Sequence, residues 1–343
     1  MTLSGVRFVL FLKSIRWIGL LCCAWLLASC SVMNTGEQSS SMPADPEVTS
    51  ADPEVASADP EVAILDPKVA IVLSLDIPDF NRIADALGVR LGEGNYSVHH
   101  LNGKPENGRN VQAEILAEES NQLVAVGLLA AKFGRTQQIR PMVFSQVYDY
   151  QKHNLVSLNS RGVAFLPPFD LQFESWRQLS PDLVRVGVVT GPNQEELLEQ
   201  IRQAAAKKNI EVLSRTVESD KEALLEFRRL APRIQGLLIL PDNRVLSPGS
   251  LRETMAIAAK RRTQVAVYSP GLLDFGALLS FSGTPEDVAK NIDAGLRQYS
   301  SNGEIPGPEL RSLTAIDVRV NPVVAGHLSL SIPAQYALTA RGN

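Results

Sequence analysis

Polar side chains directly follow several apolar segments of this chain, and their chemistry suits a binding site better than a catalytic one. Asp242 and Asn243 come straight after the uninterrupted apolar run 236–240. An Asp carboxylate can neutralise an ammonium group, and an Asn amide offers both a donor and an acceptor. The same two residue types also form turns and cap helices, so both roles stay open for them.

Comparable positions follow other apolar segments along the chain. In the first half they are Ser74, Asp76, Ser145, Gln146, Tyr148 and Asp149, and in the second half they are Thr190, Asn193 and Tyr268. Hydroxyl and amide groups can replace the water that a bound ligand loses, and tyrosine rings can form its apolar wall. Structural alternatives exist here too, since Asp76 or Asp79 could cap a helix and Tyr268 could belong to a core.

Two consecutive series of strand and helix patterns predict how these residues are positioned. Strands are expected at 69–74, 96–101, 122–127 and 141–145, and then at 184–189, 210–216, 236–240 and 265–268. The first of them is a continuous apolar run, as expected for a strand buried on both faces. Helices are expected at 79–87, 111–119, 128–133, 195–208, 220–230, 251–261 and 285–299.

This alternation predicts an α/β fold class with two doubly wound parallel-sheet lobes, a hinge and an inter-lobe cleft. The ligand site of an open α/β sheet lies beyond the carboxyl ends of its strands. We expect the first lobe at 68–168 and the second at 169–333, with the chain crossing back to the first near 275–305 and a tail at 334–343. A linker around 155–181 is expected to cross between the lobes.

The N-terminal segment 1–29 has the composition of a secretory signal peptide. It contains Arg7, Lys13 and Arg16, no acidic residue, and the apolar run 17–28 followed by Ser29. This run is shorter than the ~20 residues that a membrane-spanning helix needs. An uncleaved membrane anchor is the alternative.

The end of this segment, Leu27-Ala28-Ser29-Cys30, resembles the lipobox of bacterial lipoproteins. The resemblance implies that the cell's lipoprotein-processing enzymes cleave the chain before Cys30. Cys30 then carries a diacylglycerol and an amide-linked acyl chain such as palmitate. Several acyl chains anchor a protein firmly where one chain binds only marginally. Ser31, rather than Asp, follows the Cys. By similarity to sorting in Gram-negative bacteria, Ser31 favours the outer membrane over the inner membrane for this periplasm-facing chain.

Charge and cysteine content change once the signal is removed. The 343-residue chain has a net charge of −4, and losing the three positive charges of segment 1–29 leaves −7. Cys22 and Cys23 leave with the signal and Cys30 is acylated, so no free thiol remains. An acidic pI near 5.7 argues against a nucleic-acid partner. A hydrophobic content of 45% excludes a fully disordered chain.

Residues 30–67 have the composition of an acidic tether. The sequence Ala-Asp-Pro-Glu-Val begins at Ala44, Ala51 and Ala58, and an altered fourth copy begins at Leu65. Its period of seven is typical of a coiled coil, but the Pro in every copy excludes a continuous helix. We expect an extended spacer between the membrane and the globular part, and a docking peptide for a partner is the alternative.

Several stretches of the globular part together resemble the extracytoplasmic ABC-transporter substrate-binding proteins of the periplasmic binding protein type I fold. They are 141–144 with 148–149, 185–189 with Asn193, 240–243, and 318–333. The chain is most similar to the branch linked to aromatic amino acids or other small organic solutes. The resemblance implies a small-molecule solute and an ABC permease as partners, with no cofactor and no catalytic residue.

One position departs from that family's pattern. The third strand usually ends in a small residue and then a hydroxyl residue, which opens a helix whose backbone amides can hold a ligand carboxylate. Gly127 fits the first place, so the resemblance assigns its backbone to the site, but Leu128 stands where Thr or Ser is expected. The segment 159–163 also lacks the family's Gly-rich composition. An unusual ligand and weakened binding both stay open.

No metal site is expected. The four His residues include no pair at i, i+4 spacing, and no mature Cys remains to join them. The neighbours His99 and His100 would point to opposite faces of a strand, which is poor geometry for shared chelation. Neither a P-loop motif nor a nucleophile-elbow motif occurs.

Two functions are therefore predicted. The first is a lipid-anchored binding protein that captures a small, amino-acid-like organic solute between its lobes for an ABC importer. The second is a lipoprotein of the same fold that serves no transporter and acts as a sensor or as an envelope-assembly partner. The outer-membrane signal and the long tether favour the second.

Overall fold

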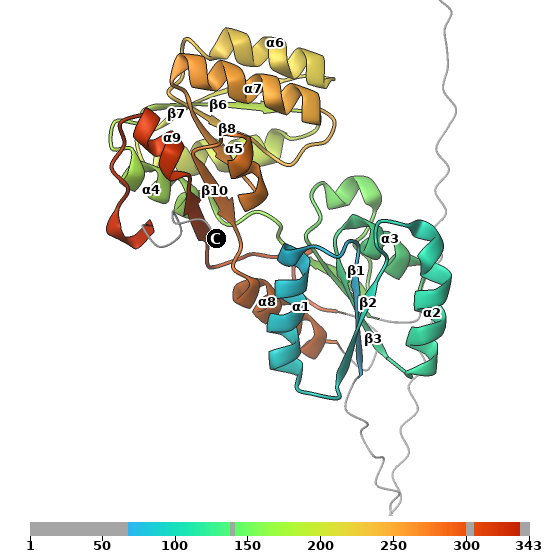
Figure 1. Ribbon diagram of the computed structural model, residues 1–343. Coiled ribbons are helices and arrows are strands. Elements are labelled where there is room, and N and C mark those ends of the chain that lie inside the picture. The colour runs from blue at the N-terminus through green and yellow to red at the C-terminus, as the bar shows by residue number, and fades with distance from the viewer. Residues whose placement is uncertain (1–67, 138–140, 300–304, 337–343) are drawn as a thin grey trace, which may run out of the picture. The chain divides into compact units, whose positions relative to one another are not determined.

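The computed structural model describes residues 68–137, 141–299 and 305–336. The predicted signal peptide, Cys30 and the tether at 30–67 lie outside these residues. The described residues form two α/β lobes, each built on a six-stranded sheet (Figure 1), and only the second sheet has an antiparallel edge strand. The predicted fold class is confirmed.

The first sheet has the strand order β11-β5-β4-β3-β1-β2, and all neighbouring strands are parallel. The strands are β1 Val69–Leu73, β2 Tyr96–His100, β3 Gln122–Val126, β4 Met142–Ser145, β5 Ser160–Val163 and β11 Leu310–Arg311. The helices of this lobe are α1 Pro78–Leu91, α2 Gly108–Ala117, α3 Leu128–Thr136 and α8 Pro285–Arg297, with the 3-10 turns η1 Pro105–Asn107 and η2 Tyr150–His153.

Helices cover both faces of the first sheet, which explains the continuous apolar run of β1. Ile71 and Leu73 belong to a core with residues of α1 and α8. Ala70 and Val72 belong to the opposite core with residues of α2 and α3. Because successive side chains of a strand point to opposite faces, every position of β1 must be apolar.

The second sheet has the order β12-β10-β9-β8-β6-β7, and β12 alone runs antiparallel to its neighbour in the described residues. The strands are β6 Arg185–Thr190, β7 Glu211–Thr216, β8 Gly236–Leu238, β9 Gln264–Val267, β10 Leu279–Ser282 and β12 Asp317–Val320. The helices are α4 Phe169–Leu179, α5 Glu195–Ala206, α6 Asp220–Leu230, α7 Pro248–Arg261 and α9 Pro322–His327, with the 3-10 turns η3 Pro270–Phe275 and η4 Ala334–Tyr336.

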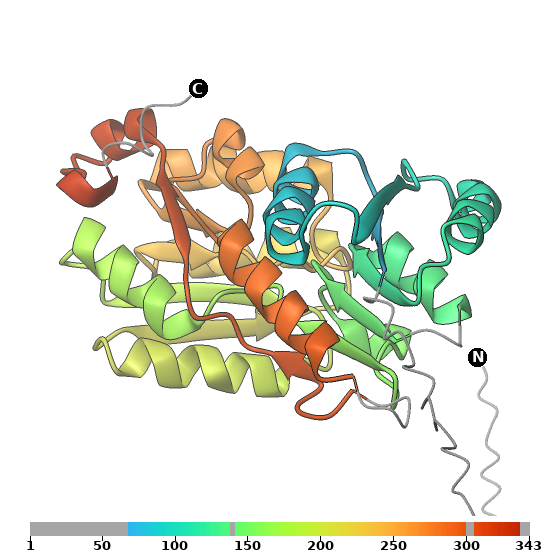
Figure 2. The ribbon, with the colours of Figure 1, turned by 90° about the horizontal axis from the view of Figure 1, so that it is seen from below.

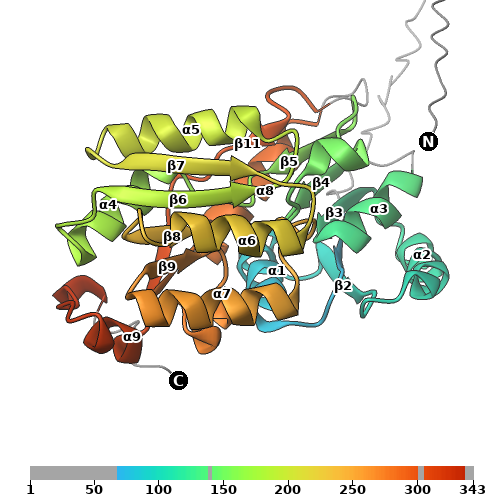
Figure 3. The same cartoon turned by 90° about the horizontal axis from the view of Figure 1, so that it is seen from above.

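The second sheet is also covered on both faces. Helices α4 and α5 share one core with the strands. Helices α6 and α7 share the other core, and Figure 3 shows them lying over the sheet. Both lobes are therefore three-layered α/β/α units.

The linker expected around 155–181 contains β5 and α4, so only part of it connects the lobes. Phe169, Phe173 and Trp176 lie at helical spacing and are buried, and the rings of Phe173 and Trp176 stack. This burial stabilises a helix directly after Pro168, where a Pro residue suits the start of a helix. The first crossing between the lobes is consequently only the short segment 164–168.

The described chain crosses between the lobes three times. After β5 it enters α4 of the second lobe, after β10 it returns to α8 of the first, and after β11 it enters β12 of the second. Figure 2 shows the last crossing, drawn in red. Gly283 lies at the second crossing, where a Cβ would stand only 2.5 Å from Leu313 of the third. The crossing segments are therefore closely packed.

Candidate functional site

Each sheet has one topological switch point, where the strand order reverses. In the first lobe it lies between β1 and β3, and in the second it lies between β6 and β8. The connections leave such a pair in opposite directions, so a crevice opens beyond the carboxyl ends of the strands. The predicted candidates Ser74, Gly127, Thr190 and Asp242 lie at or near these ends.

A serine hydroxyl lies at the switch point of the first lobe and binds the backbone there. Ser74 is 5% exposed, and its Oγ accepts a hydrogen bond of 2.8 Å from the backbone N–H of Ala130 in the first turn of α3. Leu128 opens this helix without a hydroxyl, so a neighbouring strand supplies the oxygen that the helix terminus lacks. Gly127 has φ +87°, and a Cβ there would lie 2.7 Å from Ser74 Oγ.

A carboxylate occupies the switch point of the second lobe. Asp242 is 3% exposed, and its Oδ2 accepts a hydrogen bond of 3.0 Å from Gly191 N–H, which follows β6. Its two oxygens also accept hydrogen bonds from Nε and an Nη of Arg244 at 2.8 and 2.7 Å. Burial by itself would raise the pKa of Asp242, but the donors of Arg244 and Gly191 together outweigh it and lower the pKa.

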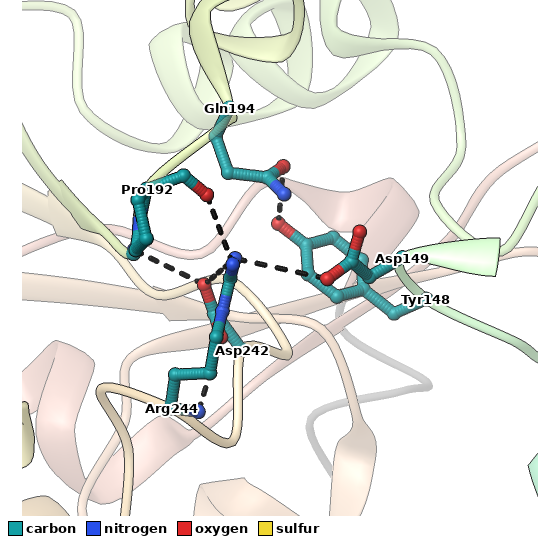
Figure 4. A network of polar contacts seen from close by, with 7 residues as sticks. Tyr148, Asp149, Pro192, Gln194, Asp242 and Arg244 are labelled. Carbon is teal, nitrogen blue, oxygen red and sulfur yellow. Dashed lines mark hydrogen bonds and ion pairs between the residues drawn. The ribbon is translucent and has the colours of Figure 1, made fainter. Parts of the chain in front are cut away.

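Arg244 also reaches the first lobe. One Nη of Arg244 lies 3.8 Å from a carboxylate oxygen of Asp149, and the other donates to Pro192 O at 2.9 Å. Beside it, the Tyr148 hydroxyl donates to Oε1 of Gln194 at 3.1 Å. Tyr148 and Asp149 follow β4 of the first lobe, whereas Gln194 and Arg244 belong to the second. Figure 4 shows these polar contacts bridging the two lobes.

Burial raises the pKa of Tyr148, and the nearby charges of Asp242 and Asp149 raise it further. The phenol is therefore neutral at physiological pH and acts as a hydrogen-bond donor to Gln194. This arrangement can orient a polar ligand or hold the lobes together. It contains no nucleophile paired with a base.

A cavity of about 650 Å³ lies beside this bridge and is lined by residues of both lobes. Tyr148, Asp149, Phe165, Asn193, Gln194 and Glu309 are among them. A second cavity of about 230 Å³ includes Gln146 and Tyr268 in its lining, and Phe165 contributes to both. The ring centroids of Phe165 and Tyr268 are 6.0 Å apart. The volume of the first cavity fits a small organic molecule.

The remaining predicted residues lie apart from these contacts. Asn243 is exposed, and Asp76 is exposed and accepts a hydrogen bond from Asn81 Nδ2 at 2.7 Å. The Oγ of Ser145 and the Oγ1 of Thr190 are fully buried, with no hydrogen-bond partner among the described residues. The structure therefore brings Tyr148, Asp149 and Asp242 together, whereas Asn243 and Asp76 point elsewhere.

Sequence reasoning missed Arg244 and Gln194, which complete the bridge. Arg244 follows Asp242 by two residues, a spacing that could have suggested a local ion pair. Its reach to Asp149 depends on how the lobes pack, which no local pattern contains. Gln194 is the N-cap residue of α5, but its side chain does not cap the helix and instead accepts a hydrogen bond from Tyr148. The role of Gln194 in the bridge therefore also depends on how the lobes pack.

Comparisons with known proteins identify the fold. No family model and no curated protein matches the chain, whereas many solved structures do. A substrate-binding protein with adhesive properties from Clostridium difficile gives a TM-score of 0.60 at 16% identity, over 78% of this chain and 96% of its own.

Two further structures agree. An ABC domain from Streptococcus pneumoniae in complex with L-Trp gives a TM-score of 0.55 at 16% identity, over 80% of this chain and 99% of its own. A conserved domain protein from Vibrio cholerae gives 0.54 at 20% identity, again over 80% of this chain and 99% of its own. The chain has the periplasmic binding protein type I-like fold.

Neither a membrane-spanning helix nor a cluster of metal ligands occurs in the described residues. None of their helices combines the length and hydropathy needed to cross a bilayer. No three His, Cys, Asp or Glu side chains in 68–137, 141–299 and 305–336 converge as a metal site requires.

Proposed function

We propose that this protein is a binding protein that captures a small, amino-acid-like organic solute between its lobes and delivers it to an ABC importer. The observation that carries the proposal is the cavity of about 650 Å³ lined by both lobes, beside the bridge of Tyr148 to Gln194 and Asp149 to Arg244. A ligand that contacts both lobes binds one lobe arrangement better than others. A transporter can then distinguish the ligand-bound arrangement from the ligand-free one. Two similar folds, one a substrate-binding protein and one bound to L-Trp, support this.

We place the protein in the Gram-negative cell envelope, held to the outer membrane through an acylated Cys30, with no enzymatic activity. The lipobox, the signal-like segment and Ser31 support this placement. Metabolic labelling with palmitate tests it, since the wild type should incorporate label and Cys30→Ser should not. Labelled wild type that fractionates with the inner membrane would refute the outer-membrane assignment alone.

A second function is favoured by the bridge itself. Arg244 holds Asp242 and reaches Asp149, so the strand-end carboxylate is already neutralised by the protein. A protein of this fold without a transporter, acting as a sensor or as an envelope-assembly partner, needs a fixed arrangement of the lobes more than a free anchoring carboxylate.

A ligand screen separates the two functions. Thermal unfolding would be followed with amino acids, purines, amines and small organic acids, where a ligand at 100 times its Kd adds about 2.7 kcal/mol of stability. Transport predicts at least one strong ligand, and Tyr148→Ala and Gln194→Ala should weaken it because both side chains line the cavity. Asn243→Ala, which changes an exposed neighbour of the bridge, is the matched control. If no compound raises the melting temperature, the transport proposal fails and the second function gains.

A further inference from the structure

The cavity between the lobes has a chemical character that the proposed function leaves open. We propose that it takes an organic cation, such as a primary or quaternary amine, in preference to a zwitterion or an anion. This inference rests on the proposed solute capture, and it narrows the amino-acid-like solute to one that has the amine of an amino acid without its carboxylate.

The first argument is the charge of the lining. Asp149, Glu195, Glu196 and Glu309 all line the cavity, and none of the described lining residues is Lys, Arg or His. Asp149 is partly compensated by Arg244 at 3.8 Å. Glu195 and Glu196 stand in the first turn of α5, where they also offset the positive end of the helix dipole. A cation entering this space meets carboxylates on several sides.

The second argument is the set of aromatic rings. Tyr148, Tyr150, Phe165 and Phe169 line the same cavity. Aromatic faces attract ammonium groups, and several rings together form the cages that bind quaternary amines. Carboxylates alone would suit an inorganic cation equally well, whereas rings of this size favour a cation with an apolar body.

Tyr150 joins the two features. Its hydroxyl donates a hydrogen bond of 3.0 Å to Oε2 of Glu309, which holds that carboxylate at the ring edge. Burial raises the pKa of Tyr150 to about 12, together with the hydrogen bond and charge of Glu309 and the charge of Glu196. The carboxylates of Glu309 and Glu196 therefore add to the effect of burial on this phenol.

The third argument concerns the carboxylate that a zwitterionic solute would bring. In the first lobe the Ala130 N–H already donates to Ser74, and Leu128 offers no hydroxyl. In the second lobe Arg244 donates to Asp242 and Pro192. These particular donors at the two switch points are thus engaged within the protein, while the groups that pair with an amine face the cavity.

The test compares indole compounds that differ in charge. Tryptamine, L-tryptophan and indole-3-acetate share one ring system and are cationic, zwitterionic and anionic at pH 7, and phenethylamine, choline and spermidine extend the cationic set. Binding to the full chain would be measured by calorimetry and thermal shift. We expect at least one amine to bind, and tryptamine to bind at least tenfold more tightly than either of the other indole compounds.

Two substitutions test whether the cation binds in this cavity. Glu196→Gln and Glu309→Gln should each weaken amine binding about 2–5-fold, as expected for charge pairs that water partly screens. Glu199→Gln is the matched control, because Glu199 lies on the same helix, is exposed, and is not part of the cavity lining. Its effect should stay below about 1.5-fold.

The outcomes separate the inference from the proposed function. Tighter binding of L-tryptophan or indole-3-acetate would overturn the inference and leave solute capture standing. Amine binding that Glu196→Gln and Glu309→Gln leave unchanged would overturn it as well, since the cation would then bind elsewhere. If no amine binds, the inference is rejected, and if the wider panel of amino acids, purines and acids also fails, solute capture is rejected with it.

Discussion

The switch points of the two lobes occupy the same place in the same strand order, yet different side chains fill them. In the first lobe Ser74 gives one neutral acceptor to the N–H of Ala130. In the second lobe Asp242 accepts from Gly191 and from Arg244, and Arg244 extends to Asp149 of the other lobe. One switch point is closed locally, and the other is connected to the partner lobe.

This difference indicates which lobe responds to the arrangement of the two. A neutral hydrogen bond within one lobe is unchanged when the lobes move apart. A guanidinium shared between Asp242 and Asp149 loses part of its interaction when they separate. We therefore expect substitution of the Asp242 carboxylate to have a larger and more pH-dependent effect on stability than substitution of the Ser74 hydroxyl.

The largest effect is expected for Asp242→Asn. The side chain is buried and accepts hydrogen bonds from Gly191 and Arg244, so removing its charge leaves the guanidinium without its main partner. We expect a loss of about 2–4 kcal/mol in the free energy of unfolding, because breaking a charge pair leaves the partly desolvated guanidinium without a compensating charge. Urea unfolding measures it, with Asn243→Ala as the control at about 0.5 kcal/mol or less. Equal effects of the two substitutions would contradict the connected switch point.

The pH dependence of the same group gives a second test. The pKa of Asp242 is lowered in the folded protein, and an unfolded Asp has a pKa of about 3.9. Its contribution is therefore present above about pH 4 and is lost as the pH falls through the lower folded value. The stability difference between the wild type and Asp242→Asn should shrink as the pH is lowered from 5 to 2.5. A difference that stays constant over this range would show that the charge of Asp242 is not what stabilises.

Gly127→Ala tests the first switch point through its backbone. Gly127 has φ +87°, a conformation that L side chains rarely adopt, and an added Cβ would lie 2.7 Å from Ser74 Oγ and 2.9 Å from Phe80. We expect a loss of about 2–3 kcal/mol from backbone strain and overpacking. Gly249→Ala is the control, since the nearest atom to its Cβ would be 3.8 Å away in the first turn of α7, and it should be neutral or slightly stabilising.

The fold could be predicted from the sequence where the core demands one residue type throughout. Strands β1 and β3 are buried on both faces and appear as apolar runs, so both were expected. Helix α6 was predicted with its observed ends, and its N-cap Ser219 accepts a hydrogen bond from Glu222 N–H. Strands β5 and β10, with the sequences SRGV and LSFS, are short and partly polar and were missed.

The site could be predicted only in part, because its residues meet through tertiary packing. The rule that ligands bind beyond strand ends selected Tyr148, Asp149 and Asp242, which the structure places together. The same rule selected Asn243, which is exposed, since it cannot tell which side chain of a turn points inward. Arg244 and Gln194 follow no strand directly, and their contacts depend on the packing of one lobe against the other.

A smaller effect is expected for Ser74→Ala. The substitution leaves the buried N–H of Ala130 without its acceptor and removes the hydroxyl that serves the N-terminus of α3. We expect a loss of about 1–2 kcal/mol, in the range of a lost helix cap or a single neutral hydrogen bond. The exposed Ser157→Ala is the control. A loss as large as that of Asp242→Asn would erase the contrast between the two switch points.

The smallest effect, with the opposite sign, is expected for Thr190→Val at the end of β6. Thr190 is fully buried and Ser74 nearly so, but the Oγ1 of Thr190 has no hydrogen-bond partner among the described residues. Val preserves the shape and removes an unsatisfied hydroxyl, so the free energy of unfolding should rise by about 0.5 kcal/mol or stay unchanged. The substitutions at 74 and 190 each delete one buried hydroxyl at a strand end, and only the bonded one should destabilise. A Thr190→Val protein as destabilised as Ser74→Ala would mean that Thr190 has a bound partner in solution. If instead the stability of Thr190→Val is unaffected and its ligand affinity falls, the hydrogen-bond partner of Thr190 is the bound solute.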